Sequence, residues 1–148
     1  CIRDSSEVVD YLEWLGSNVT ESVDKRTRFI AAGAAIHAHE KRLTDAMING
    51  TGNLPGLVEM DKVKIIGGVD NPAREGLVSL VVDGLNSADV VKKLNEQGIR
   101  THLRKADHYS GNILDPLGLD GCVRVSMCHY NSEHEVAQFL AAMKTIAA

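Results

Sequence analysis

The residues best suited to chemistry lie in one short stretch, 122–131, which reads Cys-Val-Arg-Val-Ser-Met-Cys-His-Tyr-Asn. Val123 and Val125 alternate here with Arg124 and Ser126, and successive side chains of a strand point to opposite faces. The alternation therefore predicts a strand with one apolar and one polar face. Arginine offers a planar, bidentate guanidinium, which suits the recognition of a carboxylate. The stretch predicts an anion or carboxylate site on the face of a sheet.

A second group of cations supports this interpretation. Arg100, His102 and Arg104 alternate along a predicted strand at 99–104 and so share one of its faces. If this strand lies beside the one with Arg124, the sheet has a cationic side opposite its helices. The alternative is that Arg124 is an ordinary arginine exposed on the wet side of a sheet.

A polar connection, residues 105–121, joins these two strands and shows no periodicity. So long a connection without structure is uncommon in a compact domain unless it has a function or is disordered. His108, Tyr109, Ser110 and Asn112 lie close together in it, which favours a function.

Other kinds of site are weakly supported. His37 and His39 are two residues apart in a predicted helix, where their side chains diverge and cannot share an ion. Cys122 and Cys128 share a strand face but lie too far apart for one tetrahedral metal site. Gly67-Gly68 precedes a proline-containing loop and not a helix, so a phosphate-binding loop is not predicted. We therefore predict no metal ion and no nucleotide.

The composition is that of an ordinary globular protein. The chain has 148 residues, 44% of them hydrophobic, and a net charge of −4, which predicts one domain and argues against a nucleic-acid partner. No apolar run has the length of a membrane span, and no signal peptide is recognisable, so we expect a cytoplasmic protein with free thiols. Because the sequence begins at Cys1 and not at methionine, we expect a piece of a longer protein.

Caps and periodicity predict the elements that position these residues. A first helix is expected from an N-cap at Asp4 to a C-cap at Gly16, and a longer one from Asn18 to Asn49. Small residues around Gly33 predict close packing of this second helix. After it we expect an outer strand at 62–66, a loop at 67–76 and a central strand at 77–82 that is covered on both faces. A helix at 86–97 then carries the chain to the strand at 99–104, which lies either next to the central strand or beyond an intervening one. The last helix is expected after the Ser132 to Glu135 capping box.

The run from Arg124 to Val136, followed by Phe139-Leu140, resembles the C-terminal end of class V pyridoxal-phosphate enzymes of fold type I. It is most similar to the cysteine desulfurase and selenocysteine lyase group. Residues 98–101 and 9–16 are similar to other parts of the same region, so the resemblance extends over nearly the whole chain.

The resemblance implies an α/β (α+β) fold: a two-layer small domain with a mostly antiparallel sheet of three or four strands and helices on one face. Residues 1–148 then form one C-terminal domain, in which 1–20 connect to a large domain and 21–148 form the body. The implied cofactor is pyridoxal phosphate, held by a lysine of the missing large domain. The implied substrate is a small amino acid, and the implied assembly is a cytoplasmic homodimer.

The same resemblance assigns the α-carboxylate of the substrate to Arg124. Arg104 on the cationic strand face and His108 in the polar connection are further substrate-binding candidates from the residues themselves. No lysine here stands in a Ser-x-His-Lys context, so we expect no catalytic residue in this chain and no activity from it alone. Desulfurases carry a nucleophilic cysteine in the loop after the strand at 99–104, where residues 107–110 include no thiol. Lyase, epimerase and transaminase chemistry therefore all stay open.

Two other hypotheses compete with this one. In the first, the chain is a free-standing α/β module that binds a small molecule or has a regulatory role, and Arg124 binds an anionic effector. Alternatively, the exposed sheet face joins two copies of the chain.

Overall fold

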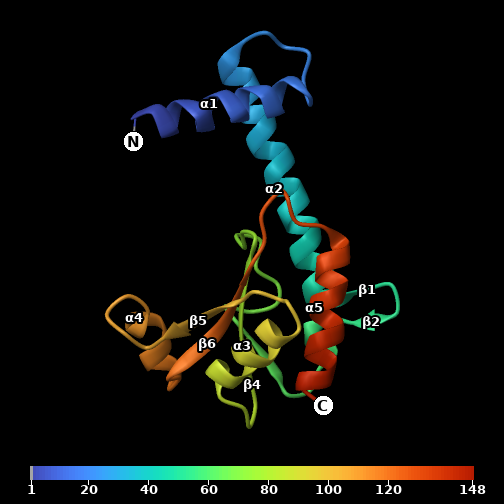
Figure 1. Ribbon diagram of the computed structural model, residues 1–148, viewed down its shortest axis with the longest axis vertical. Helices are drawn as coiled ribbons and strands as arrows, with labels where there is room; N and C mark the ends of the chain where they lie inside the picture. The colour runs from blue at the N-terminus through green and yellow to red at the C-terminus, as the bar shows by residue number, and fades with distance from the viewer. Residues whose placement is uncertain (1) are drawn as a thin grey trace.

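The computed structural model describes residues 2–148, with side chains from residue 5 onwards. An antiparallel sheet with the strand order β3-β4-β6-β5 lies at the centre of the body (Figure 1). Helices lie on one face of this sheet, which confirms the predicted α+β architecture. The strands are β3 Val63–Ile66, β4 Leu77–Val82, β5 His102–Lys105 and β6 Gly121–Ser126. The helices α3 Ser87–Glu96 and α5 Glu133–Ile146 share the hydrophobic core with the sheet.

The connection from β4 through α3 to β5 passes over an intervening strand. Both β4 and β5 pair with β6, and both pairings are antiparallel. The two outer strands of this trio are therefore parallel to each other, although they do not touch. Asn86 caps α3 as predicted, because its side chain accepts a hydrogen bond from the backbone N–H of Ala88. The crossover brings β5 and β6 together and so places their cationic residues side by side.

The hydrophobic core lies between the sheet and the helices. Along β4 the residues Val78, Leu80 and Val82 are buried, whereas those that alternate with them are only half-buried. The expected burial of this strand on both faces was therefore wrong for this chain: one face is packed and the other is open. Residues of α5 supply much of the packing as predicted, namely Val136, Phe139, Leu140, Met143 and Ile146.

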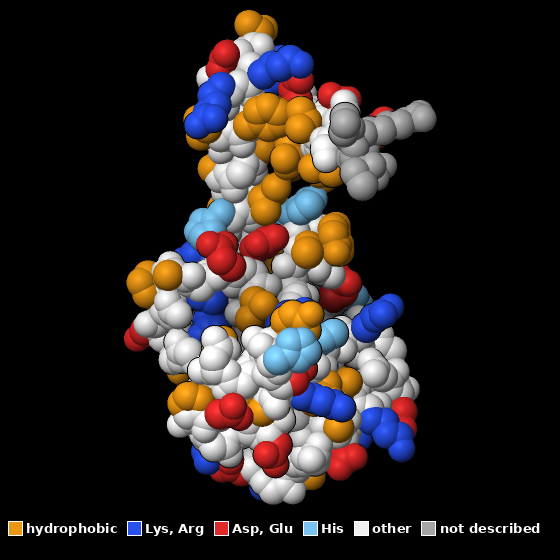
Figure 2. All heavy atoms as spheres, turned by 90° about the vertical axis from the view of Figure 1, so that its left-hand side faces the viewer, with side chains coloured by type: hydrophobic (Ala, Val, Ile, Leu, Met, Phe, Trp, Pro, Cys, Tyr) orange, Lys and Arg blue, Asp and Glu red, His pale blue; other side chains and the backbone are white. Residues whose placement is uncertain are grey.

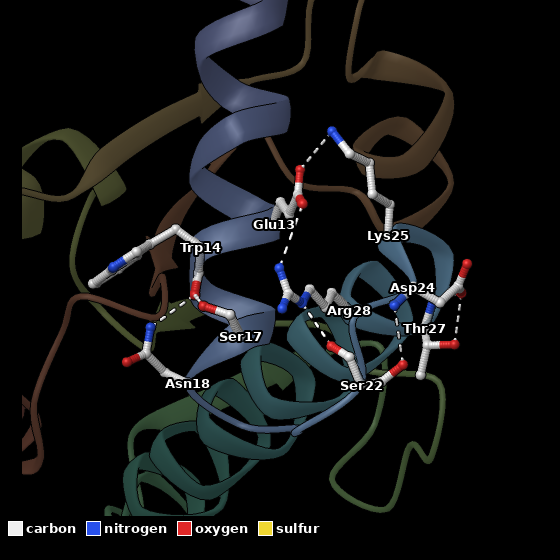
Figure 3. Close-up of polar contacts among 9 residues, drawn as sticks. All are labelled: Glu13, Trp14, Ser17, Asn18, Ser22, Asp24, Lys25, Thr27 and Arg28. Carbon is white, nitrogen blue, oxygen red and sulfur yellow. Dashed lines mark hydrogen bonds and ion pairs between the residues drawn. The ribbon is translucent and has the colours of Figure 1, made fainter.

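Helix α2, Lys25–Asn49, begins later than the sequence indicated. Its N-cap is Asp24, whose carboxylate accepts a hydrogen bond from the backbone N–H of Thr27 at 2.8 Å (Figure 3). Asn18, the predicted start, instead donates from Nδ2 to the carbonyl oxygen of Trp14 at 2.7 Å. It thereby satisfies a carbonyl group at the end of the preceding helix. Several polar residues in this connection could cap either helix, so the sequence pattern did not show which helix each one caps.

Helix α1, Ile2–Ser17, crosses the N-terminal part of α2. Because the helix begins at Ile2, Asp4 lies inside it and is not its N-cap. Gly16 is not a C-cap either. A Cβ built on Gly16 would lie 2.2 Å from the carbonyl oxygen of Arg28, so the missing side chain is what lets the two backbones approach.

Charged side chains hold the same crossing together. Glu13 on α1 forms ion pairs with Lys25 at 2.9 Å and with Arg28 at 3.5 Å (Figure 3). Among the small residues of α2, Ala32 is fully buried, but Gly33 is exposed and a Cβ there would meet nothing within 4 Å. The prediction of close packing is therefore wrong for Gly33 itself.

Helix α1 and the N-terminal part of α2 stand away from the sheet, whereas the C-terminal part of α2 packs in the core, so the molecule has a projecting lobe and a body (Figure 1). On the face in Figure 2, hydrophobic side chains gather over this lobe, and histidine and acidic side chains lie where the lobe meets the body. Of the helices that the structure describes, none combines the length and the apolar character that crossing a membrane requires.

The connections carry the remaining elements. The predicted loop at 67–76 is confirmed, and a small hairpin follows α2, with β1 Gly50–Thr51 and β2 Leu54–Pro55, before the 3-10 helix η1 Leu57–Glu59. We expected the connection 105–121 to lack regular structure, and this expectation was wrong. It contains the short helix α4, Gly111–Leu114, and the 3-10 helix η2, Asp115–Leu117, which makes it a compact cap at the end of β5.

Candidate functional site

Arg124 lies in the middle of β6, on the sheet face that points away from the helices. The ladder pairs it with Ser79 of β4 on one side and with His102 of β5 on the other. Arg124 itself is half-buried. Its Nε atom is buried and has no hydrogen-bond partner among the residues that the structure describes. Such an unpaired buried donor is costly and therefore uncommon.

Arg104 lies on the same face, in the neighbouring strand. The ladder pairs it with Cys122, so it is a diagonal neighbour of Arg124. Its Nη2 atom donates a hydrogen bond to Oγ of Ser110 at 2.9 Å. Ser110 is only 7% exposed, so this contact restricts the orientation of the Arg104 guanidinium. The predicted meeting of two cationic strands is thus present for these two arginines.

Arg100 does not belong to this arrangement. The strand β5 begins at His102, so Arg100 precedes the ladder and the predicted strand at 99–104 was too early. Arg100 instead lines a cavity of about 270 Å³ beside α5, together with Phe139. The end of a strand is hard to predict from sequence, because it depends on pairing with the neighbouring strand more than on local residue preference.

A tight turn at residues 107–110 follows β5 and supports Arg104. The carboxylate of Asp107 accepts hydrogen bonds from the backbone N–H groups of Tyr109, at 3.0 Å, and of Ser110, at 3.2 Å. The bond from Tyr109 is the main reason why the pKa of Asp107 lies below its ordinary value; the positive charges of His108 and Arg104 contribute less. This turn therefore fixes Ser110 against Arg104.

His108 lies at the exposed side of this turn. Its ring stacks on that of Tyr109, with centroids 4.0 Å apart, and Tyr109 is 74% exposed. His108 therefore belongs to the turn that orients Arg104, but no contact among the described residues joins it to Arg124.

The two described thiols differ in their surroundings. Cys122 is 4% exposed. Burial raises its pKa, while a hydrogen bond with Ser79 and the charges of Arg104 and Arg124 act in the opposite direction. Cys128 lies beyond the end of β6 and is half-buried, and a hydrogen bond to its side chain raises the pKa of Tyr130. Cys122 is therefore a neutral thiol between the two arginines.

The exit from β6 is anchored to both N-terminal helices. Oη of Tyr11 on α1 lies 2.8 Å from Nε2 of His129. Nε2 of His39 on α2 lies 2.8 Å from the carbonyl oxygen of Asn131. The side-chain oxygen of Asn131 also accepts a hydrogen bond from the backbone N–H of Cys128 at 2.9 Å. The predicted capping box of Ser132 and Glu135 follows directly. These bonds hold the end of the strand that carries Arg124.

The described residues include no group of three or more His, Cys, Asp or Glu side chains that could hold a metal ion. Two residues of the site, Ser79 and Ser110, were not predicted from the sequence. Ser79 was visible as the one polar residue in the apolar run of β4, but its position beside Arg124 depends on the register. Ser110 was visible only as one polar residue of the connection after β5.

A comparison with protein families matches residues 26–139 to the model described as aminotransferase class-V. The chain belongs to the aminotransferase class-V family. The matched residues include Arg104 and Arg124 and most of the body, so the predicted resemblance is confirmed.

Several relatives are cysteine desulfurases by name. A probable cysteine desulfurase of Pseudomonas putida is 33% identical over 109 residues, which are 74% of this chain and 24% of that protein. Another, from Halobacterium salinarum, is 30% identical over 138 residues, or 93% of this chain and 27% of that protein. The chain thus spans about a quarter of the length of these curated relatives.

A solved structure shows the same class V fold. The apo cysteine desulfurase from Thermococcus onnurineus matches with a TM-score of 0.66 and 28% identity, covering 83% of this chain and 31% of that one. The chain is therefore a cysteine desulfurase-like domain of the family. The relatives and this structure agree that the match covers only part of the longer proteins.

Proposed function

We propose that the chain is the C-terminal small domain of a pyridoxal-phosphate-dependent class V enzyme that acts on a small amino acid, and that Arg124 holds the α-carboxylate of the substrate. The observation that carries this proposal is the buried Nε of Arg124, which has no partner among the described residues. A carboxylate can pair in a bidentate manner with the outer N–H groups of this half-buried guanidinium, which has no other described partner. The half-buried position strengthens such a bond compared with one in open water.

The rest of the enzyme covers the open sheet face in this proposal. Leu77 and Val81 of β4 are half-buried on that face, as expected for a surface that another domain approaches. The chain matches only about a quarter of the P. putida relative, which leaves room for a large cofactor-binding domain. Residues 1–20 then form the connection to that domain, and residues 21–148 form the body.

The residues of this chain do not by themselves form a site for pyridoxal phosphate. The four strands contain two lysines, Lys64 and Lys105. By register, Lys64 shares the face of Arg124, but its Nζ pairs with Asp83 at 2.8 Å. Lys105 lies on the other face. No lysine of the chain stands in a Ser-x-His-Lys context, so the proposal assigns the cofactor lysine to the large domain, and we expect the chain alone to be inactive.

The contribution of this chain is to bind and orient the substrate. Arg124 holds the carboxylate, Arg104 stands beside it, and His108 is a further candidate for contact with the substrate. The turn at 107–110 offers no thiol where desulfurases carry their nucleophile, so we do not include persulfide formation. Lyase, epimerase and transaminase chemistry all need a fixed substrate carboxylate and remain alternatives. We also propose that the full protein is a cytoplasmic homodimer.

The test is Arg124→Ala in the full-length protein that contains this chain. Amino-acid binding, followed by calorimetry, should weaken roughly 10- to 100-fold, because a charge-assisted hydrogen bond contributes about 1.5–3 kcal/mol. The visible absorption of the bound cofactor should not change. Arg100→Ala is the matched control, since Arg100 lies outside the ladder, and it should leave both readouts as in the wild type.

Unchanged affinity for amino acids in Arg124→Ala would remove Arg124 from the site. A full-length protein that binds no pyridoxal phosphate would instead favour a free-standing module, in which Arg124 binds an anionic effector.

A further inference from the structure

Arg104 and Arg124 form a pair of cations on one open sheet face. Because Arg104 pairs with Cys122 and Arg124 pairs with His102, the two arginines are diagonal neighbours on adjacent strands. Diagonal neighbours in an antiparallel ladder lie roughly 7–8 Å apart, within reach of long side chains. One small molecule can therefore contact both guanidinium groups.

The surroundings of the pair do not neutralise it. On this face the four strands contribute no Asp or Glu. Asp107, in the turn after β5, is an acid that interacts electrostatically with Arg104. Its Oδ1 is engaged by two backbone N–H groups, and within the described residues it forms no ion pair with Arg104. The thiol between the arginines, Cys122, stays neutral because burial raises its pKa.

The two guanidinium groups differ in their hydrogen bonds. Arg104 is oriented by the buried hydroxyl of Ser110, which accepts from Nη2 at 2.9 Å, and this leaves its other N–H groups available. The Nε of Arg124 has no partner in the described chain. Like charges this close repel each other in a partly desolvated site. A ligand with one negative charge relieves only part of that repulsion, whereas a ligand with two relieves it fully.

We propose that the substrate is an amino acid whose side chain ends in a second carboxylate, with Arg124 on the α-carboxylate and Arg104 on the side-chain carboxylate. This inference rests on the proposed function, in which Arg124 binds the substrate. It adds the substrate class, a dicarboxylic amino acid of four or five carbons, and gives Arg104 the role of selecting it. Ser110 is a positioning residue, because it acts through Arg104.

The test compares each acid with its amide, which keeps the shape and removes one charge. Aspartate, asparagine, glutamate and glutamine, in both enantiomers, are titrated into the full-length protein by calorimetry. We expect one dicarboxylic acid to bind at least about tenfold more tightly than its amide, in line with a charge-assisted bond. In Arg104→Gln this ratio should fall towards one while affinity for the amide is kept. Arg124→Ala should weaken the acid and the amide alike.

Ser110→Ala provides a second variant, with a smaller side chain and no change of charge. It should lower the ratio of acid to amide affinity several-fold without altering the affinity for the amide. A merely structural role for Ser110 would change both affinities together. Were Arg104→Gln to misfold, the ratio in the wild type would still decide the question.

The outcomes separate the two proposals. Equal affinity of the wild type for acids and amides would overturn the dicarboxylate inference and leave the proposed function in place. Absence of binding by all four would also overturn the dicarboxylate inference, whereas the proposed function is tested separately by Arg124→Ala with a small amino acid that does bind. A tenfold preference for an acid that persists in Arg104→Gln would show that another group selects the second charge.

Discussion

The hydroxyl of Tyr11 lies 2.8 Å from Nε2 of His129, and this hydrogen bond joins residues 118 positions apart in the chain. Their rings also lie close, with centroids 5.7 Å apart, and Trp14 extends the cluster on α1. The bond links the first helix to the turn that leaves the strand of Arg124. It thus relates the orientation of the projecting lobe to the end of the candidate site.

Tyr11→Phe should remove this hydrogen bond and keep the ring. The expected loss is about 0.5 kcal/mol in the free energy of unfolding, because the bond is exposed and exposed bonds lie at the low end of the usual range. Amide hydrogen exchange should become faster in α1 and in the turn around His129. Tyr109→Phe is the control, since Tyr109 is 74% exposed and its ring contacts that of its neighbour His108. Equal effects of the two substitutions would contradict a link through the Tyr11 hydroxyl.

Two glycines in helices should respond to alanine in opposite directions. Gly16→Ala places a Cβ 2.2 Å from the backbone of Arg28, so α1 must move, and overpacking of this kind costs roughly 1–3 kcal/mol. Gly33→Ala meets nothing within 4 Å and should stabilise α2 by about 0.5–1 kcal/mol, because alanine restricts the unfolded chain. Urea unfolding monitored by circular dichroism measures both. A neutral or stabilising Gly16→Ala would show that the helices do not cross this closely.

Glu135 makes the last helix sensitive to acid. Hydrogen bonds from the backbone and side chain of Ser132, followed by that of Asn131, lower its pKa below the ordinary value of 4.5. A lowered pKa in the folded state means that the stabilisation is complete above the unfolded value and is lost as the pH falls through the folded one. Stability measured from neutral pH downwards should therefore fall less steeply in Glu135→Gln than in the wild type.

The control for this measurement is Glu96→Gln, which changes the charge of a glutamate at the end of α3. It should keep the steep dependence of the wild type. If Glu96→Gln flattened the profile as much as Glu135→Gln, the capping box would not be the source of the acid sensitivity.

The two described thiols should differ in reactivity. Cys122 is 4% exposed and its pKa is raised by burial, whereas Cys128 is half-buried. Since the thiolate is the nucleophile and must be accessible, alkylation of the native protein should be at least about tenfold slower at Cys122. Mass spectrometry of the digested protein reads each site separately. Labelling of Cys122 as fast as that of Cys128 would restore it as a candidate reactive group.

Local patterns in the sequence were sufficient for much of the body. The alternation around Arg124, the capping box at Ser132 and the cap of α3 at Asn86 all involve residues that lie close together in the chain, and the structure confirms each of them. The family was also recognisable from such a local run, from Arg124 to Val136. Where several capping residues competed, as at Asn18 and Asp24, the pattern alone chose wrongly.

Tertiary structure alone decided how the cations are arranged. The register that sets Ser79 and His102 beside Arg124, and Arg104 beside Cys122, comes from pairing between strands far apart in the sequence. Gly16 likewise acquires its role only from the backbone of Arg28 on another helix. Helical periodicity and capping depend on neighbours a few residues away, whereas strand register and helix crossing depend on burying a shared core. The sequence therefore determined that an arginine lies on a polar strand face, and the fold determined which groups surround it.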